Sequence, residues 1–265
     1  RKFKEIYVKS QQSSKSLLLS SEGYCGWPQT GYSEIDYISS SIKKLLELFD
    51  VKVILYCRRQ DLFYESLYVQ QIQQGKSLSF DEFWNSISYK NINYAKLIER
   101  YSTLFGKSNL IVRPYVKNEL YGNNVITDFF HRIKVELNDQ FNFNVWGNKG
   151  INAAALKISR IMNGILNDSN EKNKLRGILQ STNPKNPFES NNFMLPQQRR
   201  EILSFFEDFN LKLSHQWFGV DSNIFQYKEE DNPKTKISES LTIEELVEVN
   251  MKIFLKLLNQ KNPPS

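Results

Sequence analysis

The arrangement of apolar and polar positions predicts strands that alternate with amphipathic helices over the first half of the chain. The most informative stretch is residues 51–68, which read VKVILYCRRQDLFYESLY. It opens with consecutive β-formers that are apolar on both alternating faces, as in a parallel strand buried on both sides. The run ends at Arg58 and Arg59, and Gln60 begins a segment whose apolar residues recur at helical spacing. We therefore predict a buried strand that leads directly into a helix.

The same patterning predicts the remaining elements. Apolar runs at residues 16–21 and 109–115 are expected to be further strands, and the helices between them imply right-handed crossovers in a parallel sheet. The segment 167–192 is interpreted as a mobile polar insertion. We assign residues 1–225 to one α/β domain, and 226–265 to a linker and a C-terminal helix. Further amphipathic helices are expected at residues 34–49, 80–87, 92–105, 123–133, 153–166, 195–217 and 241–258.

Two arginines follow the central strand at the point where the next helix begins. A helix N-terminus presents unpaired N–H groups and the positive end of the helix dipole, and both favour anions. Ser66 lies about a turn and a half into the helix, and helical side chains tilt back towards the N-terminus. Arg58 and Ser66 can therefore converge on one phosphate, with Arg59 beside them. The alternative is that the arginines pair with surface carboxylates.

An apolar strand, an arginine and a serine eight positions later resemble the 3′-phosphate-binding segment of sulfotransferases that use PAPS (3′-phosphoadenosine 5′-phosphosulfate). The stretch RRQDLFYESLYVQQ is similar to that of bacterial members that sulfate carbohydrates or surface polysaccharides. Residues 17–24 (LLLSSEGY) and 92–115 resemble the same family, and the three stretches cover roughly the first half of the chain. The resemblance implies a P-loop-like α/β sulfotransferase fold, PAPS as the cofactor, and a carbohydrate acceptor in polysaccharide biosynthesis.

The resemblance also gives Glu22 a role. In the family, the strand before the phosphate-binding strand ends near the acceptor, where a carboxylate or a histidine deprotonates the attacking hydroxyl. Glu22 follows the expected strand at residues 16–21 and is the candidate general base. The alternative is a carboxylate that caps a helix or a loop. Trp27, in the loop that follows, could stack on a sugar ring or plug the core.

Lys149 and Gly150 are a further candidate contact to the cofactor. Many sulfotransferases carry a basic residue and a glycine late in the chain, in a loop over the 3′-phosphate and the adenine. The stretch WGNKGIN resembles that loop but lacks the arginine that usually follows. Such a turn can wrap N–H groups and an ammonium around a nucleotide, and an ordinary turn is the alternative.

Composition narrows the classes of function. The chain has 265 residues, of which 40% are hydrophobic and 24% are charged, as in ordinary globular proteins. A net charge of +6 suits a polyanionic ligand such as a nucleotide or an acidic glycan. The basic residues are dispersed and form no DNA- or RNA-binding motif, which argues against a nucleic-acid-binding protein. The Asp-x-Asp motif of sugar-nucleotide glycosyltransferases is also absent from the sequence.

The small number of cysteines and histidines limits the possible disulfides and metal sites. Two cysteines and two histidines are too few for a disulfide framework or a zinc cluster. No stretch is long and apolar enough to span a membrane, and the chain does not begin with a signal peptide. We therefore expect reduced thiols, no bound metal and a cytoplasmic location.

One motif that the resemblance requires is missing. In the family, a Gly/Thr-rich loop between the first strand and the first helix holds the 5′-phosphosulfate, and a lysine polarises the bridging oxygen. Neither GxxxxGK nor KxGTT occurs in the sequence. The chain begins at Arg1 instead of Met, so we expect an upstream segment to supply this loop and one more parallel strand. The alternative is a non-catalytic relative that binds a nucleotide or a glycan.

Overall fold

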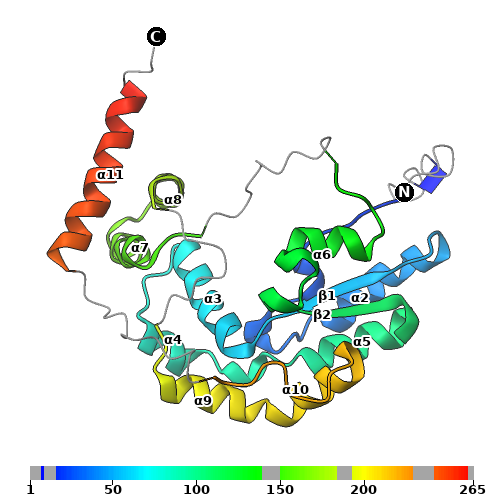
Figure 1. Cartoon of the computed structure of the whole chain (residues 1–265). Helices are drawn as coiled ribbons and strands as arrows, with labels where there is room; N and C mark the ends of the chain where they lie inside the picture. Colours follow the sequence, from blue (N-terminus) through cyan, green and yellow to red (C-terminus); the bar gives the residue numbers. More distant parts are fainter. Residues whose placement is uncertain (1–6, 9–15, 139–149, 184–192, 229–241, 262–265) are drawn as a thin grey trace. The chain divides into compact units, whose positions relative to one another are not determined.

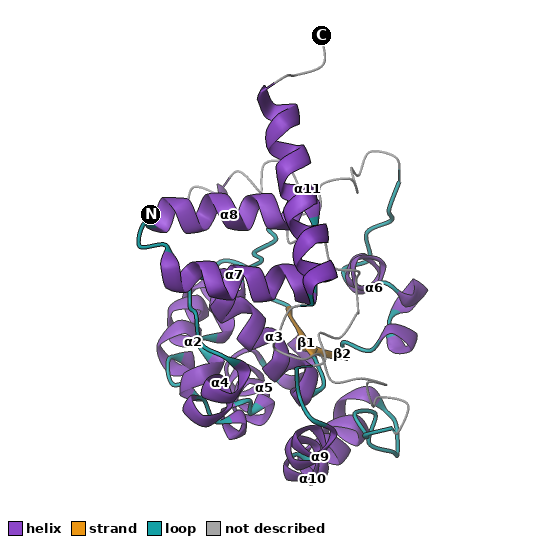
Figure 2. Ribbon diagram, turned by 90° about the vertical axis from the view of Figure 1, so that its left-hand side faces the viewer, coloured by secondary structure: helices purple, strands orange, loops and turns teal. Residues whose placement is uncertain are grey.

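A computed structural model describes residues 7–8, 16–138, 150–183, 193–228 and 242–261. In these ranges the chain is mostly helical, with one parallel sheet of two short strands (Figures 1 and 2). The strands are β1 (Val53–Cys57) and β2 (Leu110–Pro114). The helices are α2 (Ile35–Lys43), α3 (Gln60–Gln73), α4 (Phe80–Ser86), α5 (Tyr94–Phe105), α6 (Val125–Arg132), α7 (Ala153–Ile165), α8 (Ser169–Thr182), α9 (Pro196–Phe205), α10 (Glu207–Leu213) and α11 (Ile243–Lys261).

The two strands pair in parallel, which confirms the strands expected around residues 51–57 and 109–115. Val53 lies opposite Leu110, and Cys57 lies opposite Pro114. Parallel strands cannot be joined by a tight turn, and the chain between β1 and β2 accordingly forms α3, α4 and α5. The α/β character predicted from the apolar pattern is therefore present, with a small sheet and many helices.

The chain folds into two compact units, each built from separate segments of the sequence. The first unit draws on Arg1–Arg59, Ser88–Val116 and Ser204–Gln226. The second draws on Gln60–Ile87, Lys117–Leu203 and Tyr227–Ser265. The sheet belongs to the first unit, whereas α3, α7, α8 and α11 belong to the second.

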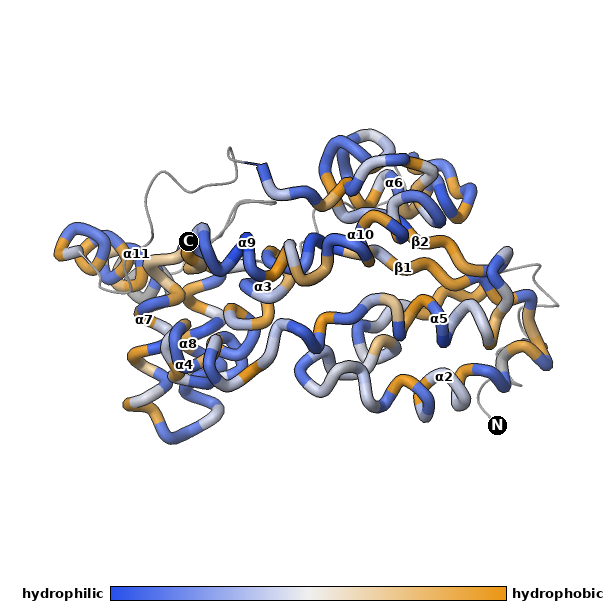
Figure 3. Tube along the Cα trace, turned by 90° about the horizontal axis from the view of Figure 1, so that it is seen from below, coloured by the Kyte–Doolittle hydropathy of each residue, from blue (hydrophilic) through white to orange (hydrophobic). Residues whose placement is uncertain are grey.

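In the first unit, α5 packs on both strands and α2 packs on α5, so that the three form successive layers (Figure 3). The side chain of Asn93 accepts a hydrogen bond from Ala95 N at 3.0 Å and begins α5. Gly106, with φ of 85°, ends it. The buried face of α5 follows helical spacing and comprises Tyr94, Leu97, Ile98, Tyr101 and Phe105.

In the second unit, α7 packs against α3 and α8, and α11 packs against α7 and α8. The side-chain amide of Asn163 on α7 donates to the backbone oxygens of Ile72, at 2.7 Å, and Lys76, at 2.9 Å. Ile72 lies in the last turn of α3, and Lys76 lies in the segment that follows the helix. The contact between α3 and α7 is thus fixed by specific hydrogen bonds as well as by apolar packing.

A buried ionic network joins α3 to α9 within the second unit. Arg199 Nη1 lies 3.0 Å from Asp61 Oδ2, and Arg199 Nη2 lies 3.1 Å from Glu65 Oε1. Phe193 N also donates to Glu65 Oε1, at 2.7 Å. All three charged side chains are buried. One guanidinium therefore bridges two carboxylates that are four residues apart on one helix.

The expectation of a strand at residues 16–21 was wrong. These residues form no strand, and the sheet consists of β1 and β2. Leu18 and Leu19 expose 59% and 37% of their surface, so the apolar run is not a core strand. A strand needs a neighbour to satisfy its backbone N–H and C=O groups, and this run does not pair with either strand. Glu22 consequently does not stand at a strand end.

Two helical predictions also need correction. Within the expected mobile insertion, Ser169–Thr182 forms α8, which begins where the Asp168 side chain accepts from Asn170 N at 2.8 Å. The apolar pattern missed α8 because Leu179 is its one buried residue. The single helix expected over residues 195–217 breaks at Phe206, whose φ of −98° and ψ of 6° are not helical.

Among the described residues, no helix has the length and apolarity needed to cross a membrane.

Replacing Arg199 with methionine should strongly destabilise the second unit. The change leaves the carboxylates of Asp61 and Glu65 buried without their cation, and breaking a buried pair costs about 3–5 kcal/mol. The free energy of unfolding is measured by denaturant titration with circular dichroism. Arg200→Met is the matched control, because the exposed Arg200 only lies over the Tyr227 ring and is worth about 1 kcal/mol or less. Equal stability of the two variants would contradict the structural role of Arg199.

Candidate functional site

The carboxyl end of β1 is fixed by two hydrogen bonds within the first unit. Tyr115 N donates to Cys57 O at 2.7 Å and extends the strand pairing past Pro114. The Tyr94 hydroxyl, from the first turn of α5, donates to Arg58 O at 2.9 Å. The backbone on both sides of the strand end is therefore held in place, and Arg58 emerges from a defined position.

Arg58 is a half-buried cation without a carboxylate partner in the described part of the chain. The alternative that it pairs with a surface carboxylate is thus not observed for Arg58. Arg59 is also half-buried and takes part in another interaction. A guanidinium held partly out of water without a counter-charge is suited to an anionic ligand, because the ligand would supply the missing charge.

The groups around the strand end influence each other's ionisation. Burial raises the pKa of the Tyr94 phenol well above its usual value, and the Arg58 charge opposes this rise. Burial also raises the pKa of Cys57, with a smaller contribution from Cys25. The pKa of Cys25 is raised by burial and then by the Glu22 carboxylate. The Tyr101 hydroxyl on α5 donates to Tyr24 O, so the turn that carries Glu22 is tied to α5 in the first unit.

Glu22 is placed by a turn instead of a strand. It is the first residue of the 3₁₀ helix Glu22–Cys25, and Ser21 Oγ accepts from Gly23 N at 3.1 Å to begin this helix. The carboxylate is exposed. Glu22 therefore lies in the same unit as Arg58, but it is carried by a 3₁₀ turn and not by the strand end that the sequence predicted. Its role as a base stays a prediction.

Ser66 and Gly150 belong to the second unit, whereas Arg58 belongs to the first. Ser66 lies on α3 in the second unit, and its hydroxyl donates to Phe63 O at 2.7 Å. To donate to a phosphate, this hydroxyl would have to release Phe63 O. Lys149 lies outside the described residues, and Gly150 is the half-buried residue that follows it. The convergence of these residues on one ligand stays a prediction.

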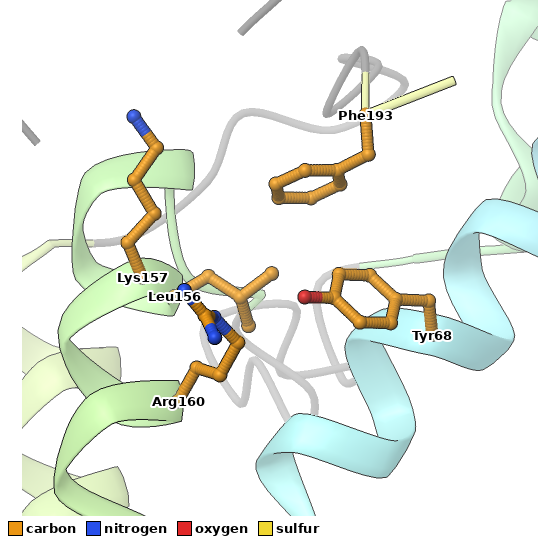
Figure 4. A pocket seen from close by; sticks show the side chains of 5 residues that line it. All are labelled: Tyr68, Leu156, Lys157, Arg160 and Phe193. Atoms are coloured by element: carbon orange, nitrogen blue, oxygen red, sulfur yellow. The ribbon is translucent and has the colours of Figure 1, made fainter. Parts of the chain in front are cut away.

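The second unit contains a small hollow of about 10 Å³ lined by Tyr68, Leu156, Lys157, Arg160 and Phe193 (Figure 4). Lys157 Nζ lies 3.4 Å from Glu245 Oε2 on α11. Pockets for small molecules usually measure about 300–1,000 Å³, so a nucleotide would not fit this hollow. In the described part of the chain, no group of His, Cys, Asp and Glu residues is arranged to hold a metal ion.

Tyr94 was not identified from the sequence as part of the site. Its position on the apolar face of an amphipathic helix predicted burial and nothing more. Its hydroxyl donates to Arg58 O, which is 36 positions away in the chain, and no local sequence pattern predicts such a long-range hydrogen bond. Arg199 was missed for the same reason, although two carboxylates on the buried side of α3 were a signal that a cation must lie opposite.

Comparisons with known proteins add one distant relative. No family model matches the sequence, and no solved structure matches the chain. An uncharacterized protein of Archaeoglobus fulgidus is 25% identical over 190 residues. The matched region is 71% of this chain and 52% of that protein, so the chain spans about half the length of this relative. These comparisons assign no family, and the site must be judged by its own chemistry.

The free energy of unfolding should fall as the pH rises above about 8.5, because Cys57 and Tyr94 have raised pKa values in the folded state. Their stabilising effect is fully present below the unfolded pKa values of about 8.5 and about 10. Above these values the unfolded chain loses protons first, and each group lowers the free energy of unfolding by up to about 1.4 kcal/mol per pH unit.

Urea unfolding between about pH 8 and about pH 11 measures this dependence. Cys57→Ala should flatten the decline that starts near pH 8.5, and Tyr94→Phe should flatten the decline above about pH 10. Identical slopes in the wild type and both variants would mean that these groups ionise as they do in the unfolded chain.

Proposed function

We propose that this chain is part of a sulfotransferase that transfers a sulfuryl group from PAPS to a carbohydrate hydroxyl. The observation that carries the proposal is Arg58, a half-buried cation without a carboxylate partner among the described residues, directly after a parallel strand. Ligands of parallel α/β sheets bind outside the carboxyl ends of the strands. The resemblance of residues 58–71 to the 3′-phosphate-binding segment of the family points to the same position.

The residues present fit the 3′-phosphate end of the cofactor. Arg58 offers the planar guanidinium that binds phosphate oxygens in a bidentate manner. Two positions later, Gln60 begins α3, so the amides of a helix N-terminus follow directly along the chain. Asp61 in this first turn would oppose an anion if its charge were exposed. It is buried against Arg199 instead, and its charge is compensated.

When bound, PAPS supplies an activated sulfuryl group. Under the proposal, Arg58 holds and orients the 3′-phosphate, and Ser66, Arg59, Lys149 and Gly150 are its proposed additional contacts. Glu22 takes the proton from the acceptor hydroxyl, because its exposed carboxylate lies in the unit that carries Arg58. Since the sequence has no phosphosulfate loop, the proposal assigns no residue of this chain to the sulfate end.

The proposed fold is the P-loop-like sulfotransferase fold, of which β1, β2 and their flanking helices would be a part. The proposed location is the cytoplasm, since Cys25 and Cys57 are free thiols and thiols persist in reducing compartments. A relative that binds the nucleotide without catalysis is the second candidate, and the missing phosphosulfate loop favours it. The two candidate functions are distinguished by a transfer assay with labelled PAPS, because only the sulfotransferase would transfer labelled sulfate.

Arg58→Ala should weaken the binding of adenosine 3′,5′-bisphosphate, the desulfated cofactor. Loss of a charge-assisted bidentate contact costs about 2–3 kcal/mol, whereas Ser66→Ala should cost about 1 kcal/mol. Isothermal titration calorimetry measures both. Arg100→Ala is the matched control in the same unit, because this arginine pairs with Asp36 at 3.0 Å. Unchanged affinity in Arg58→Ala would refute the phosphate assignment.

Glu22→Gln should lower turnover by roughly 100-fold and leave bisphosphate affinity nearly unchanged, because a general base acts on the reaction and not on cofactor binding. The assay uses a preparation that transfers sulfate from radiolabelled PAPS to a glycan acceptor. Glu47→Gln, at another exposed glutamate of the first unit, is the matched control. If both variants keep full turnover, Glu22 is a loop carboxylate without a catalytic role.

A further inference from the structure

Trp27 is strongly exposed in the first unit. It exposes 58% of its surface, whereas Trp84 and Trp217 are half-buried. The interpretation of Trp27 as a plug over the core is therefore wrong. Indole rings are mostly buried in folded proteins because they carry a large apolar area, so an exposed one needs a reason.

The loop that carries Trp27 is held in place by hydrogen bonds, so the exposure does not come from a frayed segment. Trp27 N donates to Glu34 Oε2 at 3.3 Å, and Thr30 Oγ1 donates to Trp27 O at 2.9 Å. Asn91 Nδ2 donates to Gln29 O at 2.6 Å and ties the loop to a distant part of the same unit. The ring is thus presented to solvent from a fixed backbone, which lowers the entropy cost of binding a ligand.

The helix after this loop, α2, carries a second exposed aromatic residue. Tyr37, in the first turn of α2, exposes 79% of its surface and follows Glu34, the residue before the helix, by three positions. Glu34 in turn contacts the backbone of Trp27. Trp27 and Tyr37 are thus two exposed aromatic residues of the first unit, and both lie close to Glu34 in the chain.

A carboxylate lies against the backbone of Trp27. Glu34 accepts hydrogen bonds from Ser33 and Thr30, and these bonds lower its pKa, so it is a carboxylate at neutral pH. Glu22 lies five positions before Trp27, a stretch that spans at most about 18 Å. The nearby cation, Lys96, binds Gly31 O at 3.2 Å. The Glu34 carboxylate disfavours an acidic ligand beside Trp27 and favours one whose hydroxyls donate to it.

We propose that Trp27 is the stacking platform of a subsite for neutral pyranose sugars. The C–H face of a pyranose ring packs on the indole, its hydroxyls face the carboxylates, and Tyr37 extends the platform. The inference rests on the proposed function for the identity of this sugar as part of the acceptor. Glu22, five positions before Trp27 along the chain, would then meet a hydroxyl of the bound glycan.

The test is direct binding of sugars to the chain without any cofactor. Cellohexaose, mannohexaose and maltohexaose are the neutral probes, and a polygalacturonate hexamer is the acidic probe. Affinity is measured by ligand-observed NMR titration. Trp27→Ala should weaken binding of a neutral hexamer by about tenfold or more, Trp27→Phe should retain part of it, and Tyr37→Ala should have a smaller effect. Tyr121→Ala, which removes an exposed aromatic of the second unit, is the control and should bind as the wild type does.

Binding that depends on Trp27 and prefers the neutral hexamers supports the proposal. It is overturned if no neutral hexamer binds, if Trp27→Ala binds as the wild type does, or if the acidic hexamer binds more tightly. Titration of the same variants with adenosine 3′,5′-bisphosphate separates the two proposals. If the chain binds the bisphosphate but no sugar, only the proposal of a sugar subsite is refuted. If it binds sugars through Trp27 but does not bind the bisphosphate, the proposed sulfotransferase function is refuted.

Discussion

The parallel pairing of β1 with β2 is the interaction on which the candidate site depends. It places Cys57 opposite Pro114, and the bond from Tyr115 N to Cys57 O continues it by one residue. The Tyr94 hydroxyl then holds the next carbonyl, that of Arg58. Because successive backbone groups are fixed in this way, the guanidinium of Arg58 starts from a rigid base. Rigid presentation of a cation is what the recognition of a phosphate requires.

Two arginines of the chain, Arg199 and Arg58, differ in whether a carboxylate compensates their positive charge. Arg199 is fully buried and meets two carboxylates at hydrogen-bonding distance, so its desolvation is compensated within the protein. Arg58 is half-buried and has no such carboxylate in the described residues. Removing Arg199 would leave two buried carboxylates without it, whereas our proposal pairs Arg58 with an anionic ligand. This contrast is the physical basis for placing the anion at Arg58.

Sequence patterns predicted those elements whose cause is local. The β-formers of β1, the helical spacing of α5 and its glycine end at Gly106 each follow from neighbouring residues. Residues 16–21 looked equally apolar but formed no strand, because a strand depends on a partner that local sequence does not reveal. The sequence indicates Arg58 as a candidate site residue, and that role stays a prediction. The bond that Tyr94 makes to Arg58 and the exposure of Trp27 depend on tertiary packing.

The most direct test of the anion site compares two ligands on two proteins. Adenosine 3′,5′-bisphosphate and adenosine 5′-monophosphate differ only in the 3′-phosphate, and each is titrated calorimetrically into the wild type and Arg58→Ala. If Arg58 binds the 3′-phosphate, the wild type should prefer the bisphosphate by roughly 30-fold or more, and Arg58→Ala should lose most of this preference. A preference of the same size in both proteins, or none in the wild type, would contradict the assignment.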